Sequence, residues 1–323
     1  MAGHSRSKND VASLAYGPAI HVFDVTRYKA WMAGTSPTMT MGNGSNRVGN
    51  AHGRFVWYEL TTTDMAAAKT FYAAVLGWRA HDVPMPGMDY ALFIAGKTTV
   101  AGIMGLPEHA THMGAQPRWM GYVGVDDVDA TAERIRQLGG AVHVPPEDIP
   151  DVSRFSVVAD PQAAMFALFK GLKPGQQRAG AGRGHVSWHE LLAADGETAF
   201  AFYGALFGWQ KAEADTAATG TYQTFSAGGQ TIGGMFTKPP TVPDTFWLYY
   251  FDVGDIDAAA ARVTAGGGQI LEGPIEVAGG RWILRCADPQ GAMFGLEGKR
   301  RKAVGYFESA PNPSGARGRR WHW

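Results

Sequence analysis

The sequence predicts an α+β protein in which one unit, a strand followed by a helix and three more strands, is used four times. The first observation behind this prediction is an internal repeat with a spacing of about 130 positions: Asp64, Phe71, Tyr72, Gly77 and Trp78 return as Asp195, Phe202, Tyr203, Gly208 and Trp209. The second is that ADPQAAMFALFKG (159–171) returns as ADPQGAMFGLEG (287–298). Repetition on this scale indicates two copies of one domain.

Two helices are predicted in the first copy. The stretch MAAAKTFYAAVLG follows Asp64, a suitable N-cap, and ends at Gly77, a suitable C-terminal glycine. The stretch VDATAERIRQLGG follows Asp127 in the same way, with apolar residues at helical spacing. Each copy therefore holds two similar halves.

Strands are expected around each helix. FVWYEL precedes the first helix and WMGYVGV precedes the second, while YALFIAG, TVAGIM, RFSVVAD and AMFALF follow them. These runs are short, apolar and bounded by turn residues, as strands are. The order strand, helix and three strands gives the βαβββ unit.

The expected domain boundaries follow from composition. Residues 1–53 are interpreted as a flexible N-terminal extension, 54–172 as domain 1, 173–184 as a Gly-containing linker, 185–298 as domain 2 and 299–323 as a basic flexible tail. A contact between the basic and aromatic residues of the tail and a nucleic acid is the weaker alternative.

Composition limits the classes of function. The 323 residues contain 29 acidic and 29 basic side chains, so no net charge attracts the chain to nucleic acid or to a membrane. One cysteine, Cys286, excludes an internal disulfide framework, and no apolar run approaches the length of a spanning helix. We expect a cytoplasmic protein with a small-molecule ligand, either a monomer with an internal pseudo-dimer or a homodimer.

With these motifs the sequence resembles the vicinal oxygen chelate superfamily, which contains glyoxalase I, extradiol dioxygenases and bleomycin resistance proteins. The resemblance rests on FYAAVLGW and FYGALFGW, on the second helix of each copy and on the two ADPQ hairpins. It implies four βαβββ modules paired into two glyoxalase-like domains with curved mixed sheets.

The resemblance also implies where metal ligands would stand. Metal-dependent members carry a His or Gln on the first strand of a module and a Glu on its last strand. The matching first-strand positions here are Trp57, Met120, Trp188 and Leu248, and the last-strand positions are Gly102, Ala167, Gly234 and Gly295. None offers a donor for a hard divalent ion, and Glu297 is the one weak candidate nearby. The cofactor stays unknown, and small residues at these positions suggest a roomier pocket.

Glu59 and Glu190 stand two places after Trp57 and Trp188, so strand alternation puts each glutamate on the face of its tryptophan. A carboxylate in an aromatic pocket has a raised pKa and can act as a general base or pair with a cation. Alternatively, each glutamate is a strand-end acid that accepts hydrogen bonds from a loop or from an arginine such as Arg118 or Arg281. His189 is expected in the core on the opposite face, and Cys286 in packing.

Six residues on the first strands are candidates for ligand contact: Trp57, Trp188, Tyr122, Tyr250, Met120 and Leu248. Two functions remain open. One is a protein that binds a small, partly aromatic metabolite or antibiotic. The other is an enzyme of the same superfamily: a lyase, isomerase, hydroxylase or dioxygenase that uses Glu59 or Glu190 as base, or a metal-dependent enzyme that recruits Glu297.

Overall fold

A computed structural model describes residues 51–84, 89–112, 114–149, 152–171, 181–217 and 220–300. The expected N-terminal extension (1–53) and basic tail (299–323) therefore lie almost entirely outside the described residues, as does most of the expected linker (173–184). Among the described residues, no helix has the length and apolar character needed to cross a lipid bilayer.

The described chain forms four βαβββ modules, as the repeat predicts. The first module contains β1 (Phe55–Thr62), α2 (Met65–Leu76), β2 (Arg79–Val83), β3 (Tyr90–Ala95) and β4 (Thr98–Gly105). The second contains β5 (Arg118–Gly124), α4 (Val128–Gln137), β6 (Ala141–Ile149), β7 (Ser153–Ala159) and β8 (Met165–Gly171), and the short α3 (Glu108–His112) lies between the two. The third contains β9 (Val186–Ala193), α5 (Gly196–Phe207), β10 (Gln210–Ala217), β11 (Gly220–Ala227) and β12 (Gln230–Thr237). The fourth contains β13 (Phe246–Asp255), α6 (Ile256–Ala265), β14 (Gln269–Val277), the short 3-10 helix Ala278–Gly280, β15 (Arg281–Ala287) and β16 (Met293–Lys299).

Pairs of modules form two eight-stranded mixed sheets, which confirms the predicted α+β class. The strand order is β2-β3-β4-β1-β5-β8-β7-β6 in the first sheet and β10-β11-β12-β9-β13-β16-β15-β14 in the second. We call the first sheet with its helices domain 1 and the second domain 2. In each, two modules join through an antiparallel pair of first strands, β1 with β5 and β9 with β13.

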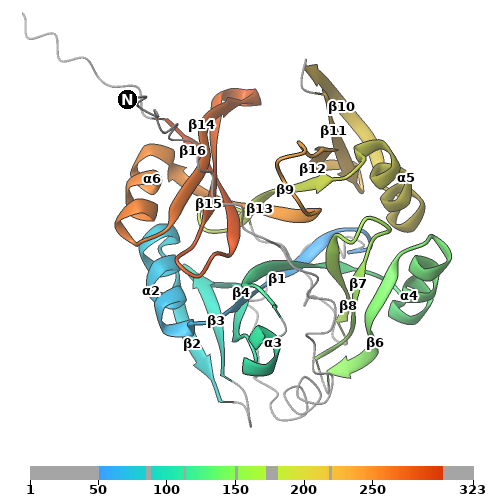
Figure 1. Cartoon of the computed structure of the whole chain (residues 1–323), viewed down its shortest axis with the longest axis horizontal. Helices are drawn as coiled ribbons and strands as arrows, with labels where there is room; N and C mark the ends of the chain where they lie inside the picture. The colour runs from blue at the N-terminus through green and yellow to red at the C-terminus, as the bar shows by residue number, and fades with distance from the viewer. Residues whose placement is uncertain are drawn as a thin grey trace, which may run out of the picture.

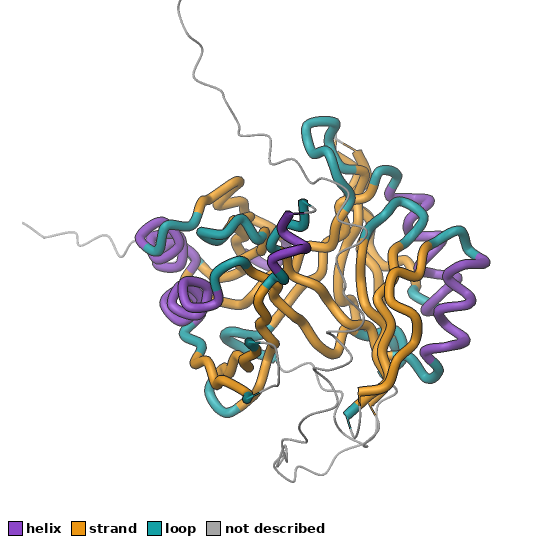
Figure 2. The backbone as a smooth tube through the Cα atoms, turned by 60° about the horizontal axis from the view of Figure 1, so that its bottom comes forward, coloured by secondary structure: helices purple, strands orange, loops and turns teal. Residues whose placement is uncertain are grey.

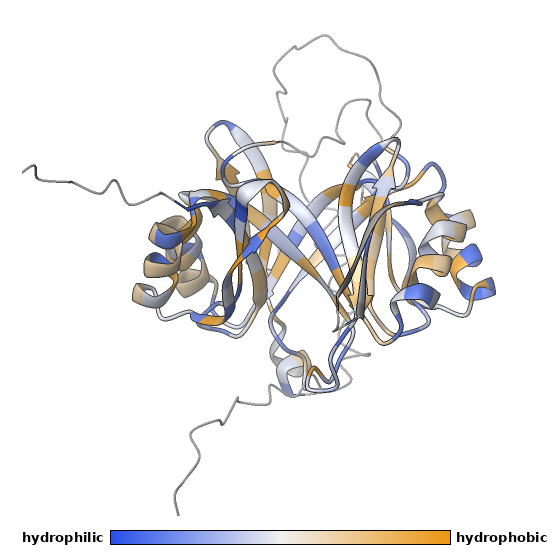
Figure 3. Ribbon diagram, turned by 90° about the horizontal axis from the view of Figure 1, so that it is seen from above, coloured by the Kyte–Doolittle hydropathy of each residue, from blue (hydrophilic) through white to orange (hydrophobic). Residues whose placement is uncertain are grey.

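Each sheet curves so that its two outer arms flank its central strands, and the two sheets meet back to back through those central strands (Figure 1). The helices lie outside the arms, α2 beside α6 on one flank and α4 beside α5 on the other (Figures 1 and 2). Hydrophobic and hydrophilic residues are mixed along the strands and the helices, and hydrophilic segments are prominent at strand ends and turns (Figure 3). Each sheet therefore has a face buried against the other domain and an inner face within its own curve.

The helices begin and end where the sequence predicts. The Asp64 carboxylate accepts a hydrogen bond from the Ala67 backbone N–H (2.9 Å), and α2 ends at Gly77, whose φ of 74° is readily adopted by glycine. Asp127 caps α4 through the Ala130 backbone N–H (2.9 Å). These caps involve only residues next to the helix ends, which is why the sequence alone predicts them.

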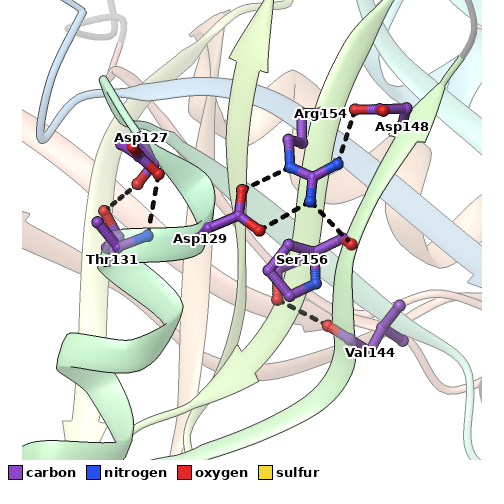
Figure 4. Close-up of polar contacts among 9 residues, drawn as sticks. Asp127, Asp129, Thr131, Val144, Asp148, Arg154 and Ser156 are labelled. Carbon is purple, nitrogen blue, oxygen red and sulfur yellow. Dashed lines mark hydrogen bonds and ion pairs between the residues drawn. The ribbon is translucent and has the colours of Figure 1, made fainter.

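An ion-pair group ties α4 to its own strands (Figure 4). The Arg154 guanidinium on β7 donates to both carboxylate oxygens of Asp129, in the first turn of α4, at 2.6 and 2.7 Å. It also donates to Asp148 on β6 at 2.9 Å. Both carboxylates are more than half exposed, so water screens these contacts and each contributes less than about 1 kcal/mol.

The two domains are held together by a polar network with two-fold pseudosymmetry. The Tyr72 hydroxyl of domain 1 donates to Asp288 of domain 2 at 3.1 Å, and Tyr203 of domain 2 donates to Asp160 of domain 1 at 3.1 Å. Each aspartate also accepts two backbone N–H bonds within its own ADPQ turn. The repeated aspartate thus shapes a hairpin and receives a tyrosine from the other domain.

Tryptophans at the ends of the first helices extend this network. The Trp78 indole N–H donates to the Gly184 carbonyl at 2.8 Å, and the Trp209 indole N–H donates to the Gly53 carbonyl at 2.6 Å. In each case the donor lies in one domain and the acceptor in the strand entry of the other. The FYAAVLGW and FYGALFGW motifs therefore serve the interface between domains.

His189 lies in this interface, as predicted for a core histidine on the face opposite Glu190. Its Nδ1 is 2.6 Å from the Ile232 carbonyl, which can only accept, so the ring proton is on Nδ1. Its Nε2 therefore accepts from the Tyr58 hydroxyl at 2.6 Å. Burial lowers the pKa of His189 to about 4, which keeps the ring neutral. Cys286 is also buried, as predicted, and burial raises the pKa of its thiol to about 12.

Removing one tyrosine hydroxyl of the interface should destabilise the fold. The Tyr72 hydroxyl also accepts from the Trp119 indole N–H at 2.9 Å, and the Tyr203 hydroxyl accepts from the Trp247 indole N–H at 3.0 Å. In Tyr72→Phe and Tyr203→Phe we expect the free energy of unfolding to fall by about 1–3 kcal/mol each, because a buried aspartate loses a donor and this buried indole N–H loses its acceptor. Urea denaturation of the purified variants measures this change. Pseudosymmetry requires two losses of similar size, so a loss in only one variant would contradict the network.

Candidate functional site

The inner face of domain 1 carries an apolar cluster of its own, separate from the core between the domains. Its buried members come from both modules of the domain: Val56, Val83, Tyr90, Met104, Met120, Tyr122, Val144, Ile149, Phe155, Val157 and Ala167. Trp57, Leu92 and Phe169 pack against this cluster and stay partly exposed. The inner face thus combines a buried apolar floor with partly accessible aromatic side chains.

Glu59 lies within this apolar cluster and is 3% exposed. Its carboxyl group accepts hydrogen bonds from the Tyr122 hydroxyl (3.1 Å) and the Tyr90 hydroxyl (3.3 Å). Within the described ranges no basic side chain forms an ion pair with it. Burial raises the pKa of Glu59 to about 7, and the two tyrosine hydrogen bonds oppose this shift only in part. The carboxyl group can therefore hold or accept a proton near neutral pH.

Glu190 occupies the equivalent place in domain 2, is 2% exposed and has a cationic partner. Its Oε2 accepts from the Tyr250 hydroxyl at 2.7 Å and from Arg285 Nε and Nη2 at 3.1 and 2.9 Å. Arg285 also donates to Glu272 on the edge strand β14. Glu190 therefore matches the alternative of an acid that accepts hydrogen bonds from an arginine, but the arginine is Arg285 and not Arg118 or Arg281. Glu59 instead accepts from two tyrosine hydroxyls.

The two predicted tryptophans lie on the same faces as their glutamates. Trp57 is partly buried on β1, opposite Tyr122 of β5. Trp188 is partly buried on β9, opposite Tyr250 of β13, and its indole N–H donates to the Tyr222 hydroxyl at 2.8 Å. Trp57 therefore lies at the accessible margin of the domain 1 cluster, while a tyrosine already engages Trp188.

Met120 and Leu248 lie directly opposite the two glutamates. Met120 is 4% exposed and pairs in register with Glu59, and Leu248 is fully buried and pairs in register with Glu190. Both form part of the apolar floor. The long thioether of Met120 adapts to a neighbouring group more readily than a branched side chain would.

Gly102, Gly234 and Gly295 do not leave open space beside the sheet, which corrects the reason given for expecting a roomier pocket. A Cβ atom at Gly102 would clash with the Tyr90 hydroxyl, and one at Gly234 would clash with the Tyr222 ring. Gly295 gives the same close approach to Tyr250. Each glycine lets a tyrosine ring lie against the sheet and point its hydroxyl toward the glutamate.

The residues present do not fit the metal site implied by the superfamily. Glu297 on β16, the one candidate ligand, accepts from Arg281 Nε at 2.5 Å and from the Ser187 hydroxyl. Across the ranges that the structure describes, no three His, Cys, Asp or Glu side chains converge as a metal ion requires. The positions flanking Glu59 and Glu190 hold tyrosine hydroxyls, tryptophan and methionine, which are poor ligands for Zn²⁺, Mn²⁺ or Fe²⁺.

Three residues of the two sites were missed from the sequence, and each had a signal. Tyr90 and Tyr222 begin the aligned stretches YALFIAG and YQTFSAG, so their recurrence was visible. Arg285 stands where the other copy has Val157, two residues before the ADPQ turn, and the residues that follow it, Cys286 and Val158, are apolar in both copies. A charge introduced into one copy of a buried strand indicates a partner within the fold.

Four βαβββ modules in two curved sheets, each with a glutamate on its inner face, define a tandem protein of the vicinal oxygen chelate type. The family model described as Glyoxalase/Bleomycin resistance protein/Dioxygenase superfamily matches residues 54–168 and 183–296. The chain belongs to this superfamily, which confirms the resemblance drawn from its motifs.

Similar proteins agree with this assignment. "Putative glyoxylase CFP32" of Mycobacterium bovis is 36% identical over 244 residues, covering 74% of this chain and 92% of the relative. Anthracycline biosynthesis protein DauV of a Streptomyces species is 32% identical over 265 residues, covering 76% and 93%. The Mn(II)-bound glyoxalase of Novosphingobium aromaticivorans has the same fold, with a TM-score of 0.55 at 17% identity over 77% of this chain and 83% of that one.

Proposed function

We propose that this protein binds a small, partly aromatic compound on the inner face of domain 1, with Glu59 as the polar group that fixes its orientation. The observation that carries this proposal is the environment of the Glu59 carboxyl group. It is buried among apolar residues and accepts hydrogen bonds from two tyrosine hydroxyls, and no described basic side chain forms an ion pair with it. A few polar groups in an apolar surround are typical of small-molecule sites.

Two further features support an aromatic ligand. Trp57 and Phe169 are partly exposed beside the buried cluster, so a flat ring can stack on them without displacing the core. A relative that is similar along most of both chains is named for anthracycline biosynthesis, and anthracyclines are planar polycyclic aromatic compounds. We therefore place a hydroxylated polycyclic aromatic compound first among candidate ligands.

Calorimetric titration with a hydroxylated anthraquinone tests this proposal. We expect Trp57→Ala to weaken binding roughly tenfold, because a stacked aromatic partner contributes about 1 kcal/mol or more. Trp188→Ala in domain 2 should change affinity less, and Trp282→Ala on β15 serves as a control for loss of a partly exposed tryptophan. A larger loss in Trp188→Ala than in Trp57→Ala would move the site to domain 2 and contradict the proposal.

A second function, catalysis with Glu59 as general base, is favoured by one observation. Burial raises the pKa of this carboxyl group to about 7, the range in which a general base works best at neutral pH. A bound compound that is converted by the wild-type protein, but only bound by Glu59→Gln, would establish this role. Mass spectrometry of the incubated compound distinguishes the two outcomes.

A further inference from the structure

The two inner faces share one arrangement of three side chains. In domain 1 Glu59 receives hydroxyl groups from Tyr90 and Tyr122. In domain 2 the equivalent residues Glu190, Tyr222 and Tyr250 lie in the same places, and Tyr222 and Tyr250 both interact with the Glu190 carboxylate. Glu59 lies in register with Gly102, and Glu190 lies in register with Gly234, so these residues occupy equivalent positions in the two sheets.

One position in this arrangement differs between the domains. Arg285 on β15 lies opposite Gly295, and Val157 on β7 lies opposite Ala167 in the equivalent row of domain 1. Val157 is fully buried and apolar, whereas the Arg285 side chain crosses the row to reach Glu190. Domain 2 therefore supplies a cation, Arg285, at a point where the described residues of domain 1 supply none.

The Arg285 guanidinium behaves as a bound planar cation would. It donates from Nε and Nη2 to the Glu190 carboxylate, and from Nε to the Tyr250 hydroxyl at 2.9 Å. Its central carbon lies 5.6 Å from the centre of the Phe236 ring, which is a cation–π contact. Met104 takes the place of Phe236 in domain 1, and a thioether adapts to a ring or a cation.

We propose that the ligand of domain 1 presents a planar, cationic N–H donor to Glu59, in the place that Arg285 fills in domain 2. This inference rests on the proposed function and narrows its ligand to an aromatic compound carrying an amidine or a related cationic group. A carboxylate and an amidinium form two parallel charge-assisted hydrogen bonds, the strongest polar contact available in such a surround. In the absence of the cation Glu59 avoids a buried unpaired charge by keeping a proton, which the arriving cation would displace.

Three probes of matched shape test the charge requirement: benzamidine, benzamide and benzoate. Calorimetry at pH 7 should show one benzamidine per chain, at least tenfold tighter than benzamide, and no binding of benzoate. Titrations in two buffers of different ionisation enthalpy should show proton release on benzamidine binding. Equal affinities for benzamidine and benzamide would overturn the inference. Anthraquinone binding that depends on Trp57, without benzamidine binding, would overturn this inference alone, and loss of both would overturn the proposed function as well.

Two substitutions test whether the cation of the ligand binds to Glu59. Val157→Arg should abolish benzamidine binding, because the new guanidinium occupies the ligand's place as Arg285 does. Glu59→Gln should weaken benzamidine at least tenfold and reduce the difference between benzamidine and benzamide. Glu133→Gln, which removes an exposed carboxylate paired with Arg136, is the charge-matched control and should leave affinity unchanged. If Val157→Arg does not fold, the Glu59→Gln comparison still decides, and unchanged benzamidine affinity there would refute the assignment.

Discussion

Replacing Arg285 by methionine should lower the free energy of unfolding by about 3–5 kcal/mol at neutral pH, because it leaves the Glu190 carboxylate buried without its cation. Glu190 is 2% exposed, and the Arg285 side chain is 19% exposed, so water compensates little of this loss. Methionine retains much of the length of the arginine side chain, so the lost charge dominates the effect. Chemical denaturation at pH 7 measures it.

A second substitution separates charge from packing. The double variant Arg285→Met/Glu190→Gln should regain most of the lost stability, because the remaining amide carries no charge that needs a partner. Arg154→Met serves as the control, since Arg154 pairs with two carboxylates that are more than half exposed, and should cost about 1 kcal/mol or less. Equal losses of stability in Arg285→Met and Arg154→Met would show that the buried ion pair contributes no more to the free energy of unfolding than the exposed one.

Substituting Glu59 by glutamine should remove one component of the pH dependence of stability, the one expected between about pH 4.5 and pH 7. Burial raises the pKa of Glu59 from 4.5 to about 7, so in this interval the folded chain holds a proton that the unfolded chain has released. Stability is therefore highest below the unfolded pKa and falls as pH rises through the folded pKa. The shift corresponds to about 3 kcal/mol at 1.36 kcal/mol for each pKa unit.

The comparison of the two proteins across pH gives this effect directly. At pH 5 wild type and Glu59→Gln should have similar stabilities, because both side chains are neutral in the folded state. At pH 8 the variant should be more stable by about 2–3 kcal/mol. The exposed substitution Glu133→Gln should give a curve parallel to wild type. A Glu59→Gln curve that also runs parallel to wild type would show that Glu59 titrates normally.

The sequence predicted most of the fold because the signals involved are local or repeated. Asp64 and Gly77 mark a helix by the hydrogen bonds and backbone angles that they allow. The two ADPQ turns and the two tryptophan–glutamate strands mark equivalent modules. Strand alternation also placed Glu59 and Trp57 on one face, since it depends only on a period of two residues. These inferences need no knowledge of distant contacts.

The polar partners of the two glutamates could not be predicted in the same way. Arg285 reaches Glu190 from a strand 95 positions later, and which arginine of β15 does so depends on the register of three strands. Arg281, four residues earlier, pairs instead with Asp252 and Glu297. A glycine at position 102 suggests open space beside the strand, but the Tyr90 side chain of a neighbouring strand fills that space. Packing between strands determines both the arginine that pairs with Glu190 and the side chain that lies against Gly102. The residue pattern of a single strand carries no information about this packing.

The reciprocal tyrosine–aspartate hydrogen bonds at the two ADPQ turns make the two halves of the chain depend on each other. Asp160 accepts a hydrogen bond from Tyr203, and Asp288 accepts one from Tyr72, so each half provides a hydrogen-bond donor to the turn of the other half. A half transplanted alone onto an unrelated partner would bring a tyrosine without its acceptor and an aspartate without its donor. On the inner faces, by contrast, equivalent positions of the two halves differ without involving the other half, as Val157 and Arg285 do. At the contact between the halves, a change of either tyrosine or either aspartate needs a matching change in the other half to keep its hydrogen bond.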